Sequence, residues 1–265
     1  DPVMRAPEGF AGANYLLVES TYGGRLHEST EPAIELETVL QETIEQKGTT
    51  VIPAFAVGRA QTLLHLIADA FEAGRLTKAP VFLDSPMAIN ASRMYCGHSS
   101  DHRLSDAQCE AACSIARYTR SVEESRAIAK VKGPKIVIAA SGMATGGRVL
   151  HHLKRYLPDT RNTVIVAGYQ AAGTLGAELL EGPERVKVFG RDVPVRARIE
   201  TVTGLSAHAD QAELTFWLQH AALAPSEVFM VHGEESSRAE FAAHVRQELG
   251  WKARAPSPGA TIELD

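Results

Sequence analysis

The sequence is poor in cysteine and has no long apolar run. Its 265 residues include three cysteines, Cys96, Cys109 and Cys113, an odd number without the spacing of a zinc-binding motif. We therefore expect no disulfide framework and a reducing, cytoplasmic setting. No stretch approaches the roughly 20 apolar residues of a membrane span, and the first residues lack the basic and apolar regions of a signal peptide. These absences argue against a membrane protein.

An excess of basic residues is absent too. The 27 Lys and Arg are outnumbered by 32 Asp and Glu, which gives a formal net charge of −5. Bulk charge therefore does not indicate a nucleic-acid-binding protein, and any basic surface must be local. With 45% hydrophobic and 22% charged residues, the composition is that of an ordinary globular protein of one large or two smaller domains.

Apolar, β-branched runs alternate with helical patterns along most of the chain. The runs cover residues 15–20, 49–55, 79–87, 134–143 and 162–170, and the helical patterns cover residues 31–47, 58–74, 88–130 and 146–157. This alternation predicts an α/β fold with a mainly parallel sheet flanked by helices on both faces. After residue 185 the pattern changes to strands at closer spacing (186–190, 193–205 and 226–233) with helices at 210–223 and 236–250. The domain boundary is therefore predicted from this change in the spacing of strands and helices.

Several predicted strands end in residues that suit chemistry. Ligands of open α/β sheets bind outside the carboxyl ends of the strands. Glu19 lies at one such end, although it could simply cap the following turn, and Asp84 before Ser85-Pro86 is more typical of a turn. Arg59 lies in the first turn of a predicted helix, where the helix dipole disfavours a cation, and a surface ion pair is its alternative.

A glycine-rich turn follows the predicted strand 134–143. It contains Ser141, Gly142, Gly146 and Gly147, directly before a predicted helix whose backbone N–H groups could hold a phosphate. The Gly-Lys-Ser/Thr ending of a Walker A loop is absent, so the turn alone is weak support for phosphate binding.

Two histidines occupy stronger positions. His208 lies at a strand-to-helix turn within Ser-Ala-His-Ala-Asp, and His232 ends the apolar strand Val-Phe-Met-Val. Imidazole suits both proton transfer near neutral pH and zinc ligation. A lone histidine at a strand end usually just forms a hydrogen bond, but two at the ends of successive strands favour a shared site. The other eight histidines are expected to be structural or solvated.

Seven motifs together resemble one known family. In order they are VESTYG, PAFAVGRAQ, FLDSPMA, ASGMATGGRVLHHL, GYQAAGTLG, GLSAHAD and VHGE, between about residues 13 and 235. This ordered set resembles the β-CASP ribonucleases of the metallo-β-lactamase superfamily, such as the cleavage-and-polyadenylation endonuclease. The resemblance implies a β-CASP domain at residues 24–205. Residues 1–23 and 206–265 would then be parts of an αββα metallo-β-lactamase domain.

The resemblance also implies roles for single residues. Glu19 and His208 fall on the acid and the histidine that act in proton transfer, and His232 falls on a zinc ligand. Arg59 and the turn with Ser141, Gly142, Gly146 and Gly147 would contact single-stranded RNA. Two zinc ions in the complete enzyme would lower the pKa of a bridging water and stabilise charge on the phosphoryl oxygens.

The sequence departs from this family in one respect. The zinc motif His-x-His-x-Asp-His does not occur, and of the expected zinc ligands His232 alone is present. Because the sequence also lacks an initial Met, we expect it to be an excerpt that is inactive or nearly so by itself and binds zinc weakly if at all.

Two other functions stay open. One is a non-catalytic RNA-binding or scaffold member of the same family. The other is an α/β enzyme that binds a small phosphorylated substrate at the Ser141–Gly147 turn, with Asp159 as a loosely placed ribose-binding acid. The RNA target, the mode of cleavage and the oligomeric state, including a homodimer, are not determined by the sequence.

Overall fold

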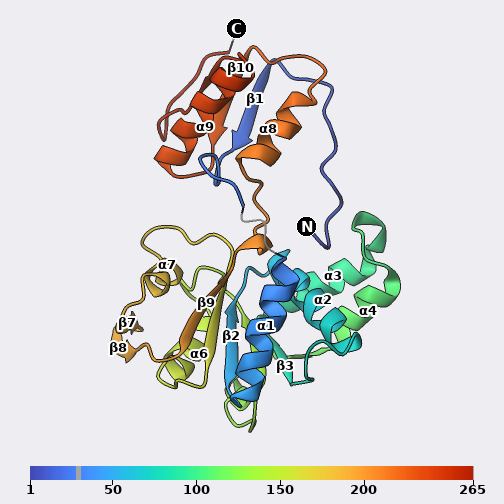
Figure 1. Cartoon of the computed structure of the whole chain (residues 1–265), viewed down its shortest axis with the longest axis vertical. Coiled ribbons are helices and arrows are strands. Elements are labelled where there is room, and N and C mark those ends of the chain that lie inside the picture. The colour runs from blue at the N-terminus through green and yellow to red at the C-terminus, as the bar shows by residue number, and fades with distance from the viewer. Residues whose placement is uncertain (28–30, 265) are drawn as a thin grey trace. The chain divides into compact units, whose positions relative to one another are not determined.

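The computed structural model describes residues 1–27 and 31–264. The chain divides into two compact units (Figure 1). The first unit contains residues 1–5 and 29–207, and the second contains residues 6–28 and 208–265. The assignment of 1–23, 24–205 and 206–265 to named domains stays a prediction.

The first unit is built on a parallel sheet. Among its described residues, six strands follow the spatial order β4 (Ala116–Tyr118), β3 (Val81–Asp84), β5 (Lys135–Ala139), β2 (Thr49–Pro53), β6 (Thr163–Ala167) and β9 (Arg198–Val202), and all neighbours run parallel. Because side chains alternate along a strand, Val51 and Ile52 enter different cores although both are fully buried. Apolar β-branched runs suit such a sheet, which is buried on both faces.

Helices cover both faces of this sheet. The core that contains Ile52 is closed by α1 (Pro32–Glu45), α2 (Arg59–Glu72), α3 (Pro86–Gly97) and α4 (Asp106–Ser114). The core that contains Val51 is closed by α5 (Val122–Ile128), α6 (Val149–Tyr156), α7 (Leu175–Leu180) and the antiparallel hairpin of β7 (Arg185–Val188) and β8 (Arg191–Pro194). Short 3₁₀ turns lie at Ser99–Asp101 and Thr203–Leu205. The predicted α/β fold, with a mainly parallel sheet flanked by helices, is confirmed.

The second unit has a smaller parallel sheet. In the described residues its strands follow the order β1 (Tyr15–Glu19), β10 (Glu227–Val231) and β11 (Ala253–Arg254). Val18, Val228 and Met230 pack with α8 (Gln211–Gln219) and α9 (Glu235–Glu248). On the opposite face, Leu17 is 67% exposed. Helices therefore cover the face that carries Val18.

Some predicted boundaries were wrong. The continuous helical pattern over 88–130 contains the strand β4, and the predicted strand 193–205 divides into the end of β8 and β9. The helix α7 was not predicted. None of the helices in the described part of the chain is long and apolar enough to cross a membrane.

The cysteines also differ from expectation. Cys96 of α3 and Cys113 of α4 form a disulfide across 17 positions, whereas Cys109 is a free, buried thiol. The two helices pack against each other, which brings these cysteines together although neither lies in a paired motif. The prediction of a reducing, cytoplasmic setting therefore loses its argument from unpaired cysteines.

Candidate active site

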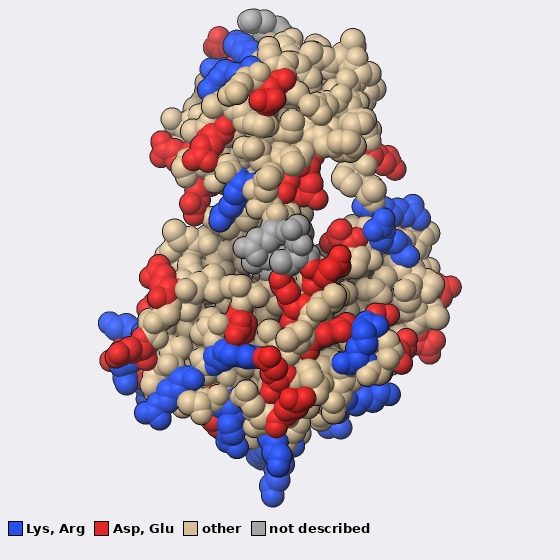
Figure 2. Space-filling model, viewed as in Figure 1, with Lys and Arg blue, Asp and Glu red and all other residues tan. Residues whose placement is uncertain are grey.

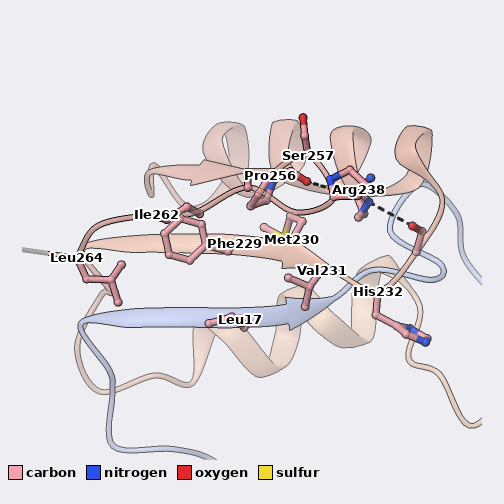
Figure 3. Close-up of a pocket in the computed structure, with 13 residues that line it drawn as sticks. Leu17, Phe229, Met230, Val231, His232, Arg238, Pro256, Ser257, Ile262 and Leu264 are labelled. Atoms are coloured by element: carbon pink, nitrogen blue, oxygen red, sulfur yellow. Dashed lines mark hydrogen bonds between the residues drawn. The ribbon is translucent and has the colours of Figure 1, made fainter.

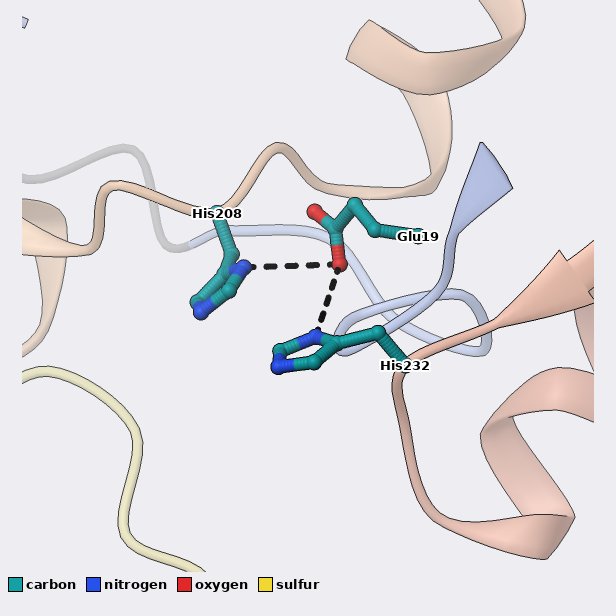
Figure 4. Close-up of side chains that lie close together, drawn as sticks. All are labelled: Glu19, His208 and His232. Atoms are coloured by element: carbon teal, nitrogen blue, oxygen red, sulfur yellow. Dashed lines mark ion pairs between the residues drawn. The ribbon is translucent and has the colours of Figure 1, made fainter. Parts of the chain in front are cut away.

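Three side chains from separate segments of the second unit meet at one point (Figure 4). The Nδ1 atom of His208 lies 3.4 Å from Oε2 of Glu19, and Nδ1 of His232 lies 4.0 Å from the same oxygen. The two imidazole rings stack with centroids 5.1 Å apart. Glu19, His208 and His232, which the sequence predicted to share a site, are therefore neighbours in the structure.

The parallel pairing of β1 with β10 places two of these residues. Glu19 is in register with Val231, so the residues that follow both strands leave the sheet at the same edge. The backbone N–H of Ser20 donates to the carbonyl of His232 over 2.9 Å. A Cβ at Gly233 would lie 2.7 Å from the Ser20 carbonyl oxygen, so the strand ends approach closely only because residue 233 is glycine.

His208 is positioned by the start of α8. Asp210 is the N-cap of that helix and forms a capping box with Glu213, which fixes the chain just after His208. The second carboxylate oxygen of Asp210 accepts a hydrogen bond of 2.8 Å from the backbone N–H of His27. The Ala-Asp that follows His208 in the sequence therefore ends the loop and begins the helix.

The carboxylate of Glu19 is held by its neighbours. Burial would raise the pKa of Glu19, but the hydrogen bond with His208 and the N–H of Thr21 outweigh it, so this pKa lies below its ordinary value. The Thr21 hydroxyl lies 3.4 Å from Nδ1 of His208 and 3.1 Å from Nδ1 of His232. Both Nδ1 atoms therefore face the Glu19–Thr21 side of the site.

The same three residues suit a metal ion. One ligand atom from each of Glu19, His208 and His232 lies within 4.8 Å of the others. Two imidazole nitrogens and a carboxylate oxygen are a usual ligand set for one catalytic zinc with an open position, and two zinc ions require further ligands. The residues present therefore fit one ion and only part of a two-zinc centre. His27, Asp210 and Glu213 form a second such group, but its carboxylates already form the capping box of α8.

An apolar cavity of about 540 Å³ lies beside this group in the second unit (Figure 3). Its walls are Leu17, Phe229 and the C-terminal segment with Ile262 and Leu264, which runs along β10. His232 lies at the edge of the cavity with its ring directed away from these apolar side chains. The cavity therefore does not contribute to the proton-transfer or metal-binding geometry.

The predicted phosphate-binding residues lie in the first unit. The strands β5, β2 and β6 are adjacent and parallel, so the Ser141–Gly147 turn and the segment before Arg59 leave the sheet at the same edge. A Cβ at Gly142 would lie 2.6 Å from the ring of Phe55, which shows how closely the two segments pack. The sheet therefore brings together two of the predicted RNA contacts.

Within the turn, the groups have different environments. The Ser141 hydroxyl accepts a hydrogen bond from the N–H of Thr145 over 3.1 Å, so it is engaged within its own turn. Gly147 has φ of 75°, and a Cβ there would lie 2.7 Å from the Ala140 carbonyl oxygen. Gly146 has no atom within 4 Å of the Cβ position. The turn therefore requires glycine at 147 and is open at 146, as backbone contact with a phosphate requires.

Arg59 is the first residue of α2 and follows Gly58, which has φ of 80°. Its Nη2 atom would lie 3.2 Å from a Cβ at Gly168, the residue after β6. The guanidinium group is therefore placed against the backbone at the carboxyl end of the central strands, on the side where the Ser141–Gly147 turn lies.

Asp84 has a larger role than the turn that the sequence predicted. It is completely buried, and its carboxylate accepts hydrogen bonds from Thr119, Ser125, Arg148 and His152 over 2.5–2.8 Å. Burial would raise the pKa of Asp84, but these hydrogen bonds outweigh it and hold the pKa far below its usual value. His152 was among the histidines expected to be structural or solvated, and its buried place in this network is a structural one.

Two family models match the chain. Residues 60–179 match the Beta-Casp domain, and residues 192–256 match the Zn-dependent metallo-hydrolase RNA specificity domain. The chain belongs to the β-CASP family of the metallo-β-lactamase ribonucleases.

This β-CASP chain is similar to several named proteins at moderate identity. Ribonuclease TTHA0252 of Thermus thermophilus is 39% identical over 84% of the chain and 52% of the relative. The transcription termination factor FttA of Methanocaldococcus jannaschii is 32% identical over 88% of the chain and 39% of the relative. An RNase J-like protein of the same organism is 31% identical over 94% and 59%. The chain thus spans between 39% and 59% of the length of these relatives.

Proposed function

We propose that this chain is part of a zinc-dependent RNA phosphodiester hydrolase. The observation that carries the proposal is the convergence of Glu19, His208 and His232 from three separate segments, with ligand atoms within 4.8 Å of one another. The ribonuclease among its relatives and the zinc-dependent RNA specificity domain at 192–256 agree with this chemistry.

The three residues have different roles in this proposal. His232 would hold zinc through its imidazole, and a zinc centre supplies a nucleophilic water at neutral pH and stabilises phosphoryl charge. His208 donates a proton to the leaving oxygen of the RNA, as a positioned imidazole can do. Glu19 orients His208 through the 3.4 Å contact with Nδ1, so that Nε2 faces the substrate.

The first unit would hold the RNA strand by its phosphates. The open backbone at Gly146 and the guanidinium group of Arg59 can contact phosphodiester oxygens without contacting a base, which gives affinity without sequence specificity. Ser141, Gly142 and Gly147 give this turn its shape. These contacts would suit any phosphodiester strand, and RNA as the substrate rests on the RNA specificity domain matched at residues 192–256.

We expect this chain alone to hold zinc weakly and to cleave RNA slowly or not at all, because its ligand set fits only part of a two-zinc centre. The test is zinc content by mass spectrometry and cleavage of labelled single-stranded RNA, for this chain and for the full-length protein encoded by its gene. About two zincs and cleavage in the longer form alone support the proposal. Tightly bound, stoichiometric zinc or RNA cleavage in the chain alone would contradict it.

Arg59→Ala in the full-length protein should weaken RNA binding to all sequences alike. Each phosphate contact with single-stranded nucleic acid contributes about 0.7 to the slope of log K against log salt concentration. We therefore expect the slope to flatten by about that amount, measured by fluorescence anisotropy between low and moderate salt. An unchanged slope would remove Arg59 from the RNA-binding residues.

A non-catalytic RNA-binding function is the second candidate. It is favoured by the incomplete ligand set and by the relatives named as transcription termination factors. A full-length protein that binds RNA, holds no zinc and does not cleave RNA would establish this second function.

A further inference from the structure

A cationic groove lies between α5 and α6 of the first unit. Its cavity measures about 630 Å³ and is lined by Arg126, Arg148, His151, Lys154 and Arg155 together with apolar and hydroxyl side chains. Among the described residues that line it there is no Asp or Glu. Because the chain as a whole carries a net charge of −5, this concentration of positive charge is local.

The cations that line the groove differ in how they are held. Arg148 is held by Asp84 and by the carbonyl oxygens of Thr119 and Arg120. In the part of the chain that the structure describes, neither Arg126 nor Lys154 forms an ion pair with a carboxylate. On α6, His151 precedes Lys154 and Arg155 by three and four positions, so these three side chains share one helix face.

An exposed aromatic ring adjoins the groove. Phe189 lies at the tip of the β7–β8 hairpin, is 51% exposed, and has its ring centroid 4.6 Å from that of His151. It has φ of 52°, and Gly190 has φ of 70°, as the two-residue turn of a hairpin requires. A large apolar side chain at an exposed hairpin tip has no packing role that the core of this unit explains.

The hairpin adds further positive charge. Arg185 and Lys187 are exposed on β7, where they alternate with buried valines. On β8, exposed Arg191 is followed by exposed Asp192, which lies opposite Lys187. Figure 2 shows Asp and Glu gathered over α1, whereas Lys and Arg are spread along the left and lower edges of the first unit, with acidic residues among those on the left. The hairpin therefore carries charge of both signs with an excess of positive charge, and the groove itself is lined by cations without a carboxylate.

We propose that the α5–α6 groove and Phe189 bind a single RNA strand, in addition to the contacts at Arg59 and the Ser141–Gly147 turn. The phosphates lie against Arg126, Lys154 and Arg155, and a base stacks on Phe189 beside His151. A cationic groove with an aromatic ring at its end is the usual arrangement for single-stranded nucleic acid, because every base has a stacking face. That the strand is RNA rests on the proposed function.

The charge is tested with a matched pair of double variants of this chain. Arg126→Gln with Lys154→Gln removes two charges from the groove, and Lys78→Gln with Arg93→Gln removes two exposed charges elsewhere in the same unit. The probe is a fluorescent single-stranded RNA of about 16 nucleotides, the upper site size of a single-strand-binding fold. Loss of two phosphate contacts should flatten the slope of log affinity against log salt concentration by about 1.4. If the two binding curves meet at 1 M salt, this corresponds to about a 25-fold loss of affinity at 0.1 M salt.

The control pair should leave the slope unchanged. Equal losses in both pairs, or no loss in the groove pair, overturn the proposal, and circular dichroism confirms that both pairs are folded. Equal affinity for a mononucleotide and for the oligonucleotide also overturns it, since the site would then hold a single phosphate and not a strand.

Stacking is tested at Phe189. Loss of one base–aromatic contact corresponds to about a five- to 150-fold loss of affinity. Phe189→Ala should show this loss without a change of salt slope, whereas Phe189→Tyr keeps the ring and should bind like the unaltered chain. Unchanged affinity of the alanine variant overturns the stacking contact.

Binding is measured here without cleavage, so the two proposals fail separately. If the full-length protein does not hydrolyse RNA but the groove variants bind RNA more weakly, the proposed hydrolase is wrong and the groove stands. If it hydrolyses RNA and the groove variants bind normally, the hydrolase stands and the groove is wrong.

Discussion

Replacing Asp84 with alanine is expected to lower the free energy of unfolding of the first unit by about 3–5 kcal/mol. Removal of one partner from a buried charged network leaves the others desolvated and unpaired, which accounts for a loss of this size. Here the substitution leaves Thr119, Ser125, Arg148 and His152 without their common acceptor. Because these four residues join β4, α5 and α6 to β3, the loss should be felt across one side of the sheet.

Urea unfolding followed by two probes measures this effect. Both tryptophans, Trp217 and Trp251, lie in the second unit, so their fluorescence follows that unit, whereas far-ultraviolet circular dichroism follows both. We expect the urea concentration at the midpoint of the circular-dichroism transition to fall. The tryptophan fluorescence should still report a folded second unit at urea concentrations that unfold the first unit. Asp69→Ala is the matched control, since the Asp69–Arg75 pair is about half exposed and such pairs contribute about 0–1 kcal/mol. Equal losses in the two variants would contradict a special role for Asp84.

The contribution of Asp84 should also depend on pH. Its pKa in the folded chain lies well below the ordinary value. As the pH falls through about 4, the unfolded state therefore takes up a proton on this group while the folded state does not. The stabilisation is therefore complete above the unfolded pKa and is lost as the pH falls toward the folded pKa. Asp84→Asn removes this dependence, so the stability gap between it and the unaltered chain should narrow below about pH 4. A gap that stays constant through that range would show that the carboxylate charge is not what stabilises the network.

The parallel sheet could be predicted from sequence because its strands are buried on both faces. The strand β5, for example, is buried along its whole length, and helices separate such strands along the chain. The strand β4 was missed because it lies at the edge of the sheet, is three residues long and is only partly buried, so its Ala-Arg-Tyr has no strand pattern. The split between β8 and β9 was missed because both are polar on one side and only three residues separate them.

The candidate site could be predicted in part for a different reason. Glu19 ends β1 and His232 follows the parallel strand β10, and the rule that strand ends converge at one edge identifies such residues. His208 was found only by its motif, since its position depends on the capping of α8. The Asp84 network could not be predicted, because its hydrogen-bond partners lie 35 to 68 residues away in the sequence, in segments whose packing has no local pattern. The Cys96–Cys113 disulfide could not be predicted for the same reason, since it depends on how α3 packs against α4.

In the full-length protein, His208→Ala should slow RNA cleavage about 10²–10⁴-fold, the range for loss of a positioned proton donor. Zinc content and RNA affinity should remain, because in our proposal His208 acts on the leaving oxygen. His232→Ala should instead lose zinc together with activity, since His232 is the proposed ligand. The distinction is informative because the two imidazoles are stacked and both approach Glu19, so geometry alone makes them similar.

His220→Ala is the matched control. His220 is the exposed residue directly after α8, lies in the same unit and belongs to no proposed site. Cleavage is followed under single-turnover conditions, which separates the chemical step from product release, and zinc is measured on the same samples. If His208→Ala loses zinc as His232→Ala does, His208 is a ligand and the proton must come from another group. If it keeps both zinc and rate, proton transfer by His208 is wrong, and the 3.4 Å contact with Glu19 serves only to hold the loop that precedes α8.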